Sequence, residues 1–301
     1  MNCLGLFTTA AVSLLAAGQL PDGVEKHELT DEAFVADFYT KQDAPPAVGV
    51  LVLGGSEGGK PSRLAQGLAA KGFAVLAVAY FKAEGTPDYL DMIPLEYFEQ
   101  PLEWLASQEA VRDGKIVVIG GSKGGELALL LASRHPEIAG VVAISPSSVV
   151  FQGIPKVFWP PRSSWSYHGE PIPFVPYDYS QPIDTKNLLP LYQRSLQQDD
   201  AVARATIPVE RIGGPVLLFS GVDDTMWPAT DMCDDMVSRL RERAFAHEYQ
   251  HVDYPNAGHT LNEQFMLGGT REGNQAARID SARRIVDFLH HVNVGGSETA
   301  R

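Results

Sequence analysis

Apolar, β-branched runs alternate along the chain with segments whose apolar residues recur at helical spacing. Buried strands that alternate with helices form a parallel sheet whose two faces the helices cover. The pattern therefore predicts an α/β fold with a mostly parallel central sheet and helices on both faces. The expected strands span residues 48–53, 73–80, 116–119, 141–145, 216–219 and 247–254, and the expected helices span residues 61–71, 95–108, 126–135, 230–243 and 275–291.

The alternation breaks between Val150 and Pro208, where prolines and aromatic residues are frequent. A long insertion of this kind in a compact domain is usually a lid or a binding loop. The aromatic rings of such an insertion can pack it onto the domain or line a pocket for an apolar group. We expect some of the rings to pack the insertion and others to line a pocket. The residues predicted to contact substrate are Trp165, Tyr167 and Phe174 in the insertion and Trp227 further along the chain.

The N-terminus carries an uncharged apolar run from Leu4 to Ala17 that ends in small residues. This pattern predicts a secretory signal peptide over residues 1–18 and a single domain over residues 19–301. The alternative is an apolar helix docked on the domain, because no Lys or Arg lies near Met1. Export to the periplasm or medium follows from the first interpretation, and a cytoplasmic location from the second. Cys3 precedes the predicted cleavage point, so no lipid anchor is expected.

Charge and cysteine content exclude several classes of partner. The formal net charge is −13, from 37 acidic and 24 basic residues, which opposes general attraction to nucleic acid or to an anionic membrane. Two cysteines, Cys3 and Cys233, provide neither a disulfide framework nor a metal-ligand cluster. We predict no metal, no cofactor, no membrane span and no nucleic-acid partner, and the oligomeric state stays open.

The most informative motif is Gly120-Gly121-Ser122-Lys123-Gly124, which lies between an expected strand and an expected helix. A G-x-S-x-G at such a junction is typical of the nucleophile elbow of α/β-hydrolases, where a sharp turn raises the serine hydroxyl above the sheet. Glycines flank the serine because a side chain there would collide with the neighbouring strand and helix. Ser122 is therefore the predicted nucleophile.

A serine hydroxyl needs a base to take its proton and a carboxylate to orient that base. In α/β-hydrolases the chain order is Ser, then Asp or Glu, then His. Asp224 follows the expected strand at 216–219 and is the favoured acid, with Asp223 as its rival. His259 lies just after the last expected strand, where the third member of the triad belongs. We predict the triad Ser122, Asp224 and His259.

The tetrahedral intermediate requires two backbone N–H groups directed at its oxyanion. Lys123, directly after the nucleophile, should supply one, and Ser56 or Glu57 in the Gly-rich loop after the first expected strand should supply the other. The same loop also fits the start of a phosphate-binding loop, G-x-x-x-x-G-K, over residues 54–60. Pro61 replaces the Ser or Thr that such a loop requires, which disfavours a nucleotide site.

With these pieces placed, the chain resembles the catalytic domain of the acyl-CoA thioesterase and bile acid-CoA:amino acid N-acyltransferase family, a relative of dienelactone hydrolases. The likeness extends over about residues 45 to 290. The segments that carry it are Leu95-Glu96-Tyr97-Phe98-Glu99, Gly121-Ser122-Lys123-Gly124-Gly125-Glu126, Asp223-Asp224 with Trp227, Tyr254-Pro255 with Ala257-Gly258-His259, and Trp165-Ser166-Tyr167-His168-Gly169-Glu170 with Pro171-Ile172-Pro173-Phe174.

The resemblance implies a serine hydrolase of acyl thioesters or carboxylic esters that works through an acyl-enzyme. Conjugating transferases of the family use cysteine as the nucleophile, so Ser122 favours transfer to water. Long-chain thioesterases of the family carry an N-terminal β-sandwich domain, for which the roughly 45 residues before the first expected strand are too few. The alternatives are an exported carboxylesterase, similar to dienelactone hydrolase, that does not act on CoA, and a non-catalytic binding protein on the same fold.

Overall fold

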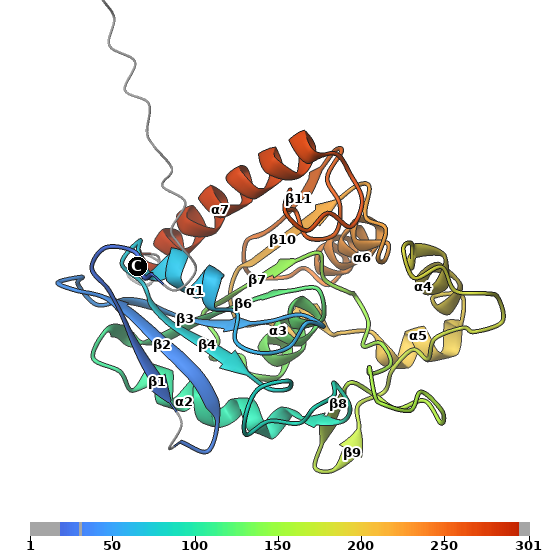
Figure 1. Cartoon of the computed structure of the whole chain (residues 1–301), viewed down its shortest axis with the longest axis horizontal. Helices are drawn as coiled ribbons and strands as arrows, with labels where there is room; N and C mark the ends of the chain where they lie inside the picture. Colours follow the sequence, from blue (N-terminus) through green and yellow to red (C-terminus); the bar gives the residue numbers. More distant parts are fainter. Residues whose placement is uncertain (1–18, 30–31, 295–301) are drawn as a thin grey trace, which may run out of the picture.

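A computed structural model describes residues 19–29 and 32–294. Its main sheet has eight strands in the order β1-β2-β4-β3-β6-β7-β10-β11 (Figure 1). Neighbouring strands from β4 to β11 pair in parallel, whereas β2 pairs antiparallel with both β1 and β4. The strands are β1 Val24–Leu29, β2 Val35–Lys41, β3 Ala47–Leu53, β4 Ala74–Ala79, β6 Val111–Gly121, β7 Gly140–Ile144, β10 Val216–Gly221 and β11 Tyr249–Tyr254.

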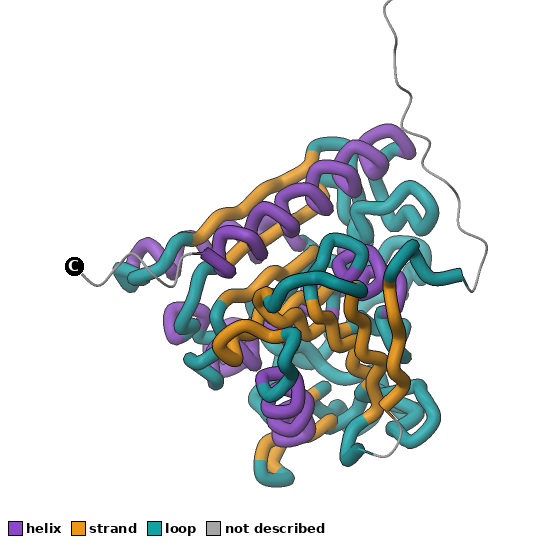
Figure 2. Tube along the Cα trace, turned by 90° about the vertical axis from the view of Figure 1, so that its left-hand side faces the viewer, coloured by secondary structure: helices purple, strands orange, loops and turns teal. Residues whose placement is uncertain are grey.

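Helices cover both faces of the sheet, as the sequence pattern predicts. On one face α2, α3 and α6 pack against side chains such as Leu51 and Val118. On the other face α1 and α7 pack against the alternating set that includes Val50 and Val52. Figure 2 shows α7 running along the twisted sheet. The helices are α1 Ser62–Ala69, α2 Glu99–Ala106, α3 Lys123–Arg134, α6 Ala229–Glu242 and α7 Arg271–Val294, with a 3₁₀ turn η1 at Leu95–Phe98.

The expectation that the sheet begins at residue 48 is wrong, because β1 and β2 precede that strand. Their sequences, VEKHEL and VADFYTK, include charged residues that sheet edges tolerate, and β1 is half-exposed. Asp37 of β2 is buried and is held by Lys60 at 2.5 Å and by Lys26 at 3.1 Å. The apolar pattern did not predict this hairpin, because a charged residue occupies a buried position in one of its strands.

The segment between β7 and β10 contains more regular structure than the sequence pattern indicates. A small three-stranded sheet joins β5, β8 and β9, and two short helices follow. Figure 1 shows these helices beyond the end of the main sheet toward which β3 and β7 point. The elements of this segment are β8 Trp165–Tyr167, β9 Glu170–Pro171, α4 Leu189–Ser195, α5 Asp199–Ala205 and a 3₁₀ turn η2 at Val209–Arg211, whereas β5 Ile93–Pro94 lies between β4 and β6.

The strand order places a topological switch between β3 and β6. The chain runs from β3 to β4 on one side and then returns to β6 on the other, so the loops after β3 and β6 diverge and leave room at their carboxyl ends. The Gly-rich loop follows β3, and Ser122 follows β6. Across residues 19–29 and 32–294, no helix is long and apolar enough to cross a membrane. The predicted signal peptide at 1–18 lies outside the described residues.

Candidate active site

Ser122 occupies a sharp turn between β6, which ends at Gly121, and α3, which begins at Lys123. Its backbone has φ 54° and ψ −123°, and its N–H donates to the Ile144 carbonyl at 2.8 Å. A Cβ at Gly120 would lie 2.0 Å from the Gly124 carbonyl oxygen, so only glycine allows the strand and helix to cross this closely. The turn leaves Ser122 half-buried at the end of the sheet.

His259 lies in the loop after β11 and connects the serine to the acid. Its Nε2 is 2.8 Å from Ser122 Oγ, and its Nδ1 is 2.7 Å from Asp224 Oδ2. The backbone N–H of His259 donates to the Leu267 carbonyl at 2.9 Å, so the following loop folds back and fixes the residue. The side chain is 4 % exposed. The structure thus brings the three residues of the predicted triad into one hydrogen-bonded chain.

Asp224 follows β10, and its two carboxylate oxygens have separate partners. Oδ1 accepts backbone N–H groups from Met226 at 2.6 Å and Trp227 at 3.2 Å, which leaves Oδ2 for the imidazole. Asp224 is buried, whereas the neighbouring Asp223 is exposed. The fixed carboxylate also sets the histidine tautomer, because it accepts a hydrogen bond from the Nδ1–H group and leaves the unprotonated Nε2 facing the serine.

A cluster of aromatic rings packs beside the imidazole. Trp227 is 1 % exposed and meets the His259 ring edge-on, with centroids 5.3 Å apart. Its indole N–H donates to the Ser145 carbonyl at 3.1 Å, and its ring stacks on Phe151 at 5.8 Å. Burial raises the pKa of Tyr192, which packs edge-on against both rings, to about 12, so its phenol stays neutral. Trp227 therefore supports the His259 ring and presents almost no surface to a ligand.

The cluster also shows what the sequence pattern missed. Phe151, Tyr177 and Tyr192 come from the insertion, and the pattern marks none of them as a site residue. Their only signal is their position in a proline-rich segment, which does not distinguish packing from binding. Residues of the insertion and of the loop after β10 share this cluster, so the insertion packs against Trp227, whose ring in turn meets that of His259.

The three insertion residues predicted to contact substrate lie in three different places. Trp165 is fully buried, and its indole N–H donates to Glu126 at 2.8 Å, so this side chain belongs to the core. Tyr167 packs under the guanidinium of Arg134, 4.0 Å from the ring centroid. Arg134 ends α3, about 18 Å along the helix axis from Ser122 at the usual rise per residue. Neither Trp165 nor Tyr167 is placed to line a pocket at Ser122.

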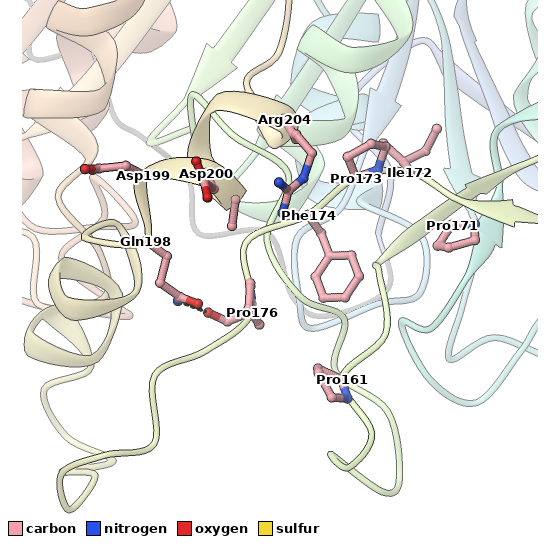
Figure 3. A pocket seen from close by; sticks show the side chains of 11 residues that line it. Pro161, Pro171, Ile172, Pro173, Phe174, Pro176, Gln198, Asp199, Asp200 and Arg204 are labelled. Carbon is pink, nitrogen blue, oxygen red and sulfur yellow. Dashed lines mark hydrogen bonds between the residues drawn. The ribbon is translucent and has the colours of Figure 1, made fainter.

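Phe174 is partly buried and lines an open cavity of about 890 Å³ on the insertion (Figure 3). The cavity lies between the proline-rich segment and α5, and Gln198 Nε2 donates across it to the Pro176 carbonyl at 2.8 Å. None of the triad residues belongs to its lining, so the position of Phe174 leaves its predicted role as a substrate contact a hypothesis. The lining residues are Pro161, Pro171, Ile172, Pro173, Phe174, Pro176, Gln198, Asp199, Asp200, Ala201 and Arg204.

The Gly-rich loop after β3 lies against the nucleophile turn. A Cβ at Gly55 would be 3.2 Å from the Ser122 Cβ, and the Gly55 N–H donates to the Glu57 carboxylate at 2.9 Å. Among the described residues, the N–H groups of Ser56 and Glu57 have no protein acceptor. Lys60, which the phosphate-loop alternative requires to be free, pairs with Asp37. The loop therefore has free donors beside the serine and no available lysine.

A second Ser-His-Asp chain exists elsewhere in the molecule. His251 Nε2 is 2.8 Å from Ser220 Oγ, and its Nδ1 is 2.9 Å from Asp234 Oδ1. Ser220 lies within β10 with none of its surface exposed, and its hydroxyl also contacts Thr230 Oγ1 at 2.9 Å. A substrate carbonyl cannot reach this serine. The two hydrogen-bonded Ser-His-Asp groups differ in whether a substrate can reach the serine, because of the two serines only Ser122 is placed on a turn beyond the end of the sheet.

Solved structures of hydrolases share this architecture. A putative dienelactone hydrolase from Klebsiella pneumoniae superposes with a TM-score of 0.57 at 18% identity, over 89% of this chain and 98% of that one. An acylaminoacyl peptidase from Pyrococcus horikoshii gives 0.61 at 11% identity, over 90% of this chain and 42% of that one. The sheet order and the raised serine, together with these neighbours, define the protein as an α/β-hydrolase.

A family model narrows this class. The C-terminal region of the BAAT / acyl-CoA thioester hydrolase family matches residues 93–292, two thirds of the chain, and the chain belongs to that family. Mouse mitochondrial acyl-coenzyme A thioesterase 2 is 29% identical over 90% of this chain and 61% of its own length. Human acyl-coenzyme A thioesterase 1 is 27% identical over 93% of this chain and 68% of its own length. The chain thus spans about two thirds of these relatives.

Proposed function

We propose that this protein is a serine hydrolase that cleaves acyl thioesters or carboxylic esters through an acyl-enzyme. Ser122 Oγ attacks the acyl carbonyl while His259 Nε2 takes its proton. The imidazolium then gives that proton to the leaving thiol or alcohol, and Asp224 stabilises the imidazolium. Water, activated by the same histidine, releases the carboxylic acid. The observation that carries the proposal is the hydrogen-bonded chain from Ser122 through His259 to Asp224.

Free backbone N–H groups in two segments support this mechanism. Lys123 is the first residue of α3, and an N–H at that position has no partner within the helix. The loop after β3 offers the free N–H groups of Ser56 and Glu57 on the other side of the serine. In the proposed mechanism Lys123 and Ser56 donate to the oxyanion, and the helix N-terminus adds a favourable electrostatic contribution.

The nucleophile is tested by a pair of matched variants. Ser122→Ala should reduce kcat by a factor on the order of 10⁴ to 10⁶, whereas Ser220→Ala, in the buried Ser-His-Asp chain, should leave kcat within a few-fold. A fluorophosphonate should attach to Ser122, as mass spectrometry of its peptide would show. Full activity of Ser122→Ala would overturn the assignment. A wild-type chain without turnover or labelling would favour a binding protein on this fold.

The substrate class is proposed from the relatives and from charge. The named relatives are acyl-coenzyme A thioesterases, which favours an acyl-CoA thioester. The net charge of −13 and an exported location would instead favour a neutral carboxylic ester. A panel that pairs acyl-CoA thioesters with simple esters of the same acyl groups separates these options, because only the leaving group differs within each pair. A kcat/KM at least tenfold higher for one member of each pair would assign the class.

A further inference from the structure

A buried ion pair lies directly beneath the nucleophile turn. Lys123 Nζ is 2.5 Å from Glu126 Oε1, and the two side chains are 2 % and 0 % exposed. The same Glu126 oxygen accepts the indole N–H of Trp165 at 2.8 Å, and its other oxygen accepts the Phe151 backbone N–H at 3.3 Å. Trp165 and Phe151 belong to the insertion. The first turn of α3 is therefore tied to the insertion by Glu126.

The same cluster reaches the loop after β3. Tyr80 packs its ring against Trp165, with centroids 5.7 Å apart, and its hydroxyl donates to the Gly54 carbonyl at 2.5 Å. A Cβ on Gly124 would lie 2.4 Å from that carbonyl oxygen, so the start of α3 and the loop are in direct backbone contact. Both segments that carry the proposed oxyanion donors therefore rest on one cluster, formed by Tyr80, Lys123, Glu126 and Trp165, here called the support cluster.

Stability alone is a poor reason for a charged pair at this position. Desolvation raises the pKa of Glu126 and lowers that of Lys123, so burial opposes both charges. Well-packed apolar side chains of similar volume are often no less stable than a buried ion pair. Charged and indole groups provide direction instead, because each hydrogen bond fixes an angle as well as a distance. The hydrogen bonds of Glu126 thereby fix the position of Lys123 relative to the insertion.

We propose that Glu126 and Trp165 are positioning residues that hold the Lys123 backbone N–H and the loop after β3 in register around the oxyanion. They act through Lys123 and Tyr80 and touch no reacting atom. The inference rests on the proposed function. It adds that the insertion controls the chemical step, because Trp165 is an insertion residue buried under the nucleophile.

The test separates positioning from folding. Trp165→Phe removes the indole N–H and keeps most of the ring, and Glu126→Gln keeps the volume but removes the charge. Each should lower kcat for a short-chain ester by about 10- to 100-fold with KM within threefold, because a displacement near 1 Å at a reacting centre costs about this much. A trifluoromethyl ketone, which forms an oxyanion on the serine, should lose affinity by a similar factor. Trp104→Phe, on α2, is the matched control and should change neither.

A double variant keeps the proposal falsifiable if a single variant folds poorly. Lys123→Met with Glu126→Met removes both charges, so no buried charge is left unpaired. It should fold, as thermal unfolding would show, and still have reduced kcat and weaker ketone binding. Wild-type kcat and ketone affinity in folded Trp165→Phe and in the double variant would overturn this inference alone. A wild-type chain inactive on all esters and thioesters would overturn the proposed function first.

Discussion

Asp223 and Asp224 are adjacent residues with unlike surroundings. Asp224 is buried and bonded to His259, whereas Asp223 is exposed. We expect Asp224→Asn to lower kcat by roughly 10⁴-fold, because an amide in that place can favour the wrong histidine tautomer. Asp223→Asn should stay within a few-fold of wild type. Steady-state kinetics on one ester would decide, and the reverse ranking would move the acid to Asp223.

Gly124 and Gly67 make a second instructive pair of single residues. A Cβ on Gly124 would clash with Gly54 at 2.4 Å, whereas a Cβ on Gly67 would meet nothing within 4 Å. Gly124→Ala should therefore destabilise the protein by about 1–3 kcal/mol and reduce kcat. Gly67→Ala, in α1, should stabilise it by about 0.5–1 kcal/mol with kcat unchanged. Urea unfolding with parallel kinetics measures both, and a neutral Gly124→Ala would contradict the close contact.

Among the elements, α7 is fastened to the end of β11 by Asp280. Its carboxylate accepts from Arg284 at 2.5 Å, from Arg283 at 2.7 Å and from the Tyr254 hydroxyl at 2.9 Å. These hydrogen bonds lower the pKa of Asp280 to about 2, and the bond from Arg284 contributes most. An unfolded aspartate titrates near pH 4 (roughly 3.9). The bonds of Asp280 thus add to the free energy of unfolding above the unfolded pKa, and this stabilisation is lost as the pH falls toward 2.

Asp280→Asn should accordingly weaken the dependence of stability on acid. Between pH 7 and pH 3 the urea midpoint of the wild type should fall by more than that of the variant. Asp287→Asn is a control on the same helix, since within the described part of the chain that carboxylate bonds only Arg283, at 3.1 Å. It should leave the acid dependence closer to that of the wild type. Equal pH dependence in wild type and Asp280→Asn would show that this contact does not contribute.

Elements also show which parts of the structure the sequence could predict. The apolar strands of the parallel sheet were predictable, because long β-branched runs are typical of buried strands. The serine turn was predictable, because a glycine-flanked serine at the end of a strand is typical of this turn. The hairpin of β1 and β2 was not, because the buried Asp37 is neutralised by Lys26 and Lys60, which lie elsewhere in the sequence. The buried position of Trp165 could not be predicted for the same reason, since its hydrogen-bond partner Glu126 lies 39 residues away.

For the molecule as a unit, the net charge of −13 makes a prediction about acyl-CoA. A negative protein repels the polyanionic CoA, and salt shortens the range of that repulsion from roughly 10 Å at 0.1 M to roughly 3 Å at 1 M. If acyl-CoA is hydrolysed, its kcat/KM should rise several-fold over this range. An uncharged ester of the same acyl group is the control and should change little. A fall with salt for acyl-CoA alone would instead indicate a local basic site for the phosphates.

The backbone conformation of Ser122 lowers the thermal stability of the protein as long as a side chain is kept at this position. With φ at 54°, any Cβ there is strained, at a cost of about 1–2 kcal/mol, and glycine alone escapes it. Ser122→Gly should be inactive yet unfold at a higher temperature than the equally inactive Ser122→Ala, a difference that calorimetry would detect. Equal melting temperatures would show that the turn stores no strain. If Ser122 is the nucleophile, as proposed, a homologue under no selection for catalysis would gain stability by replacing it with glycine. Inactive homologues should therefore be sought among chains with glycine at this position.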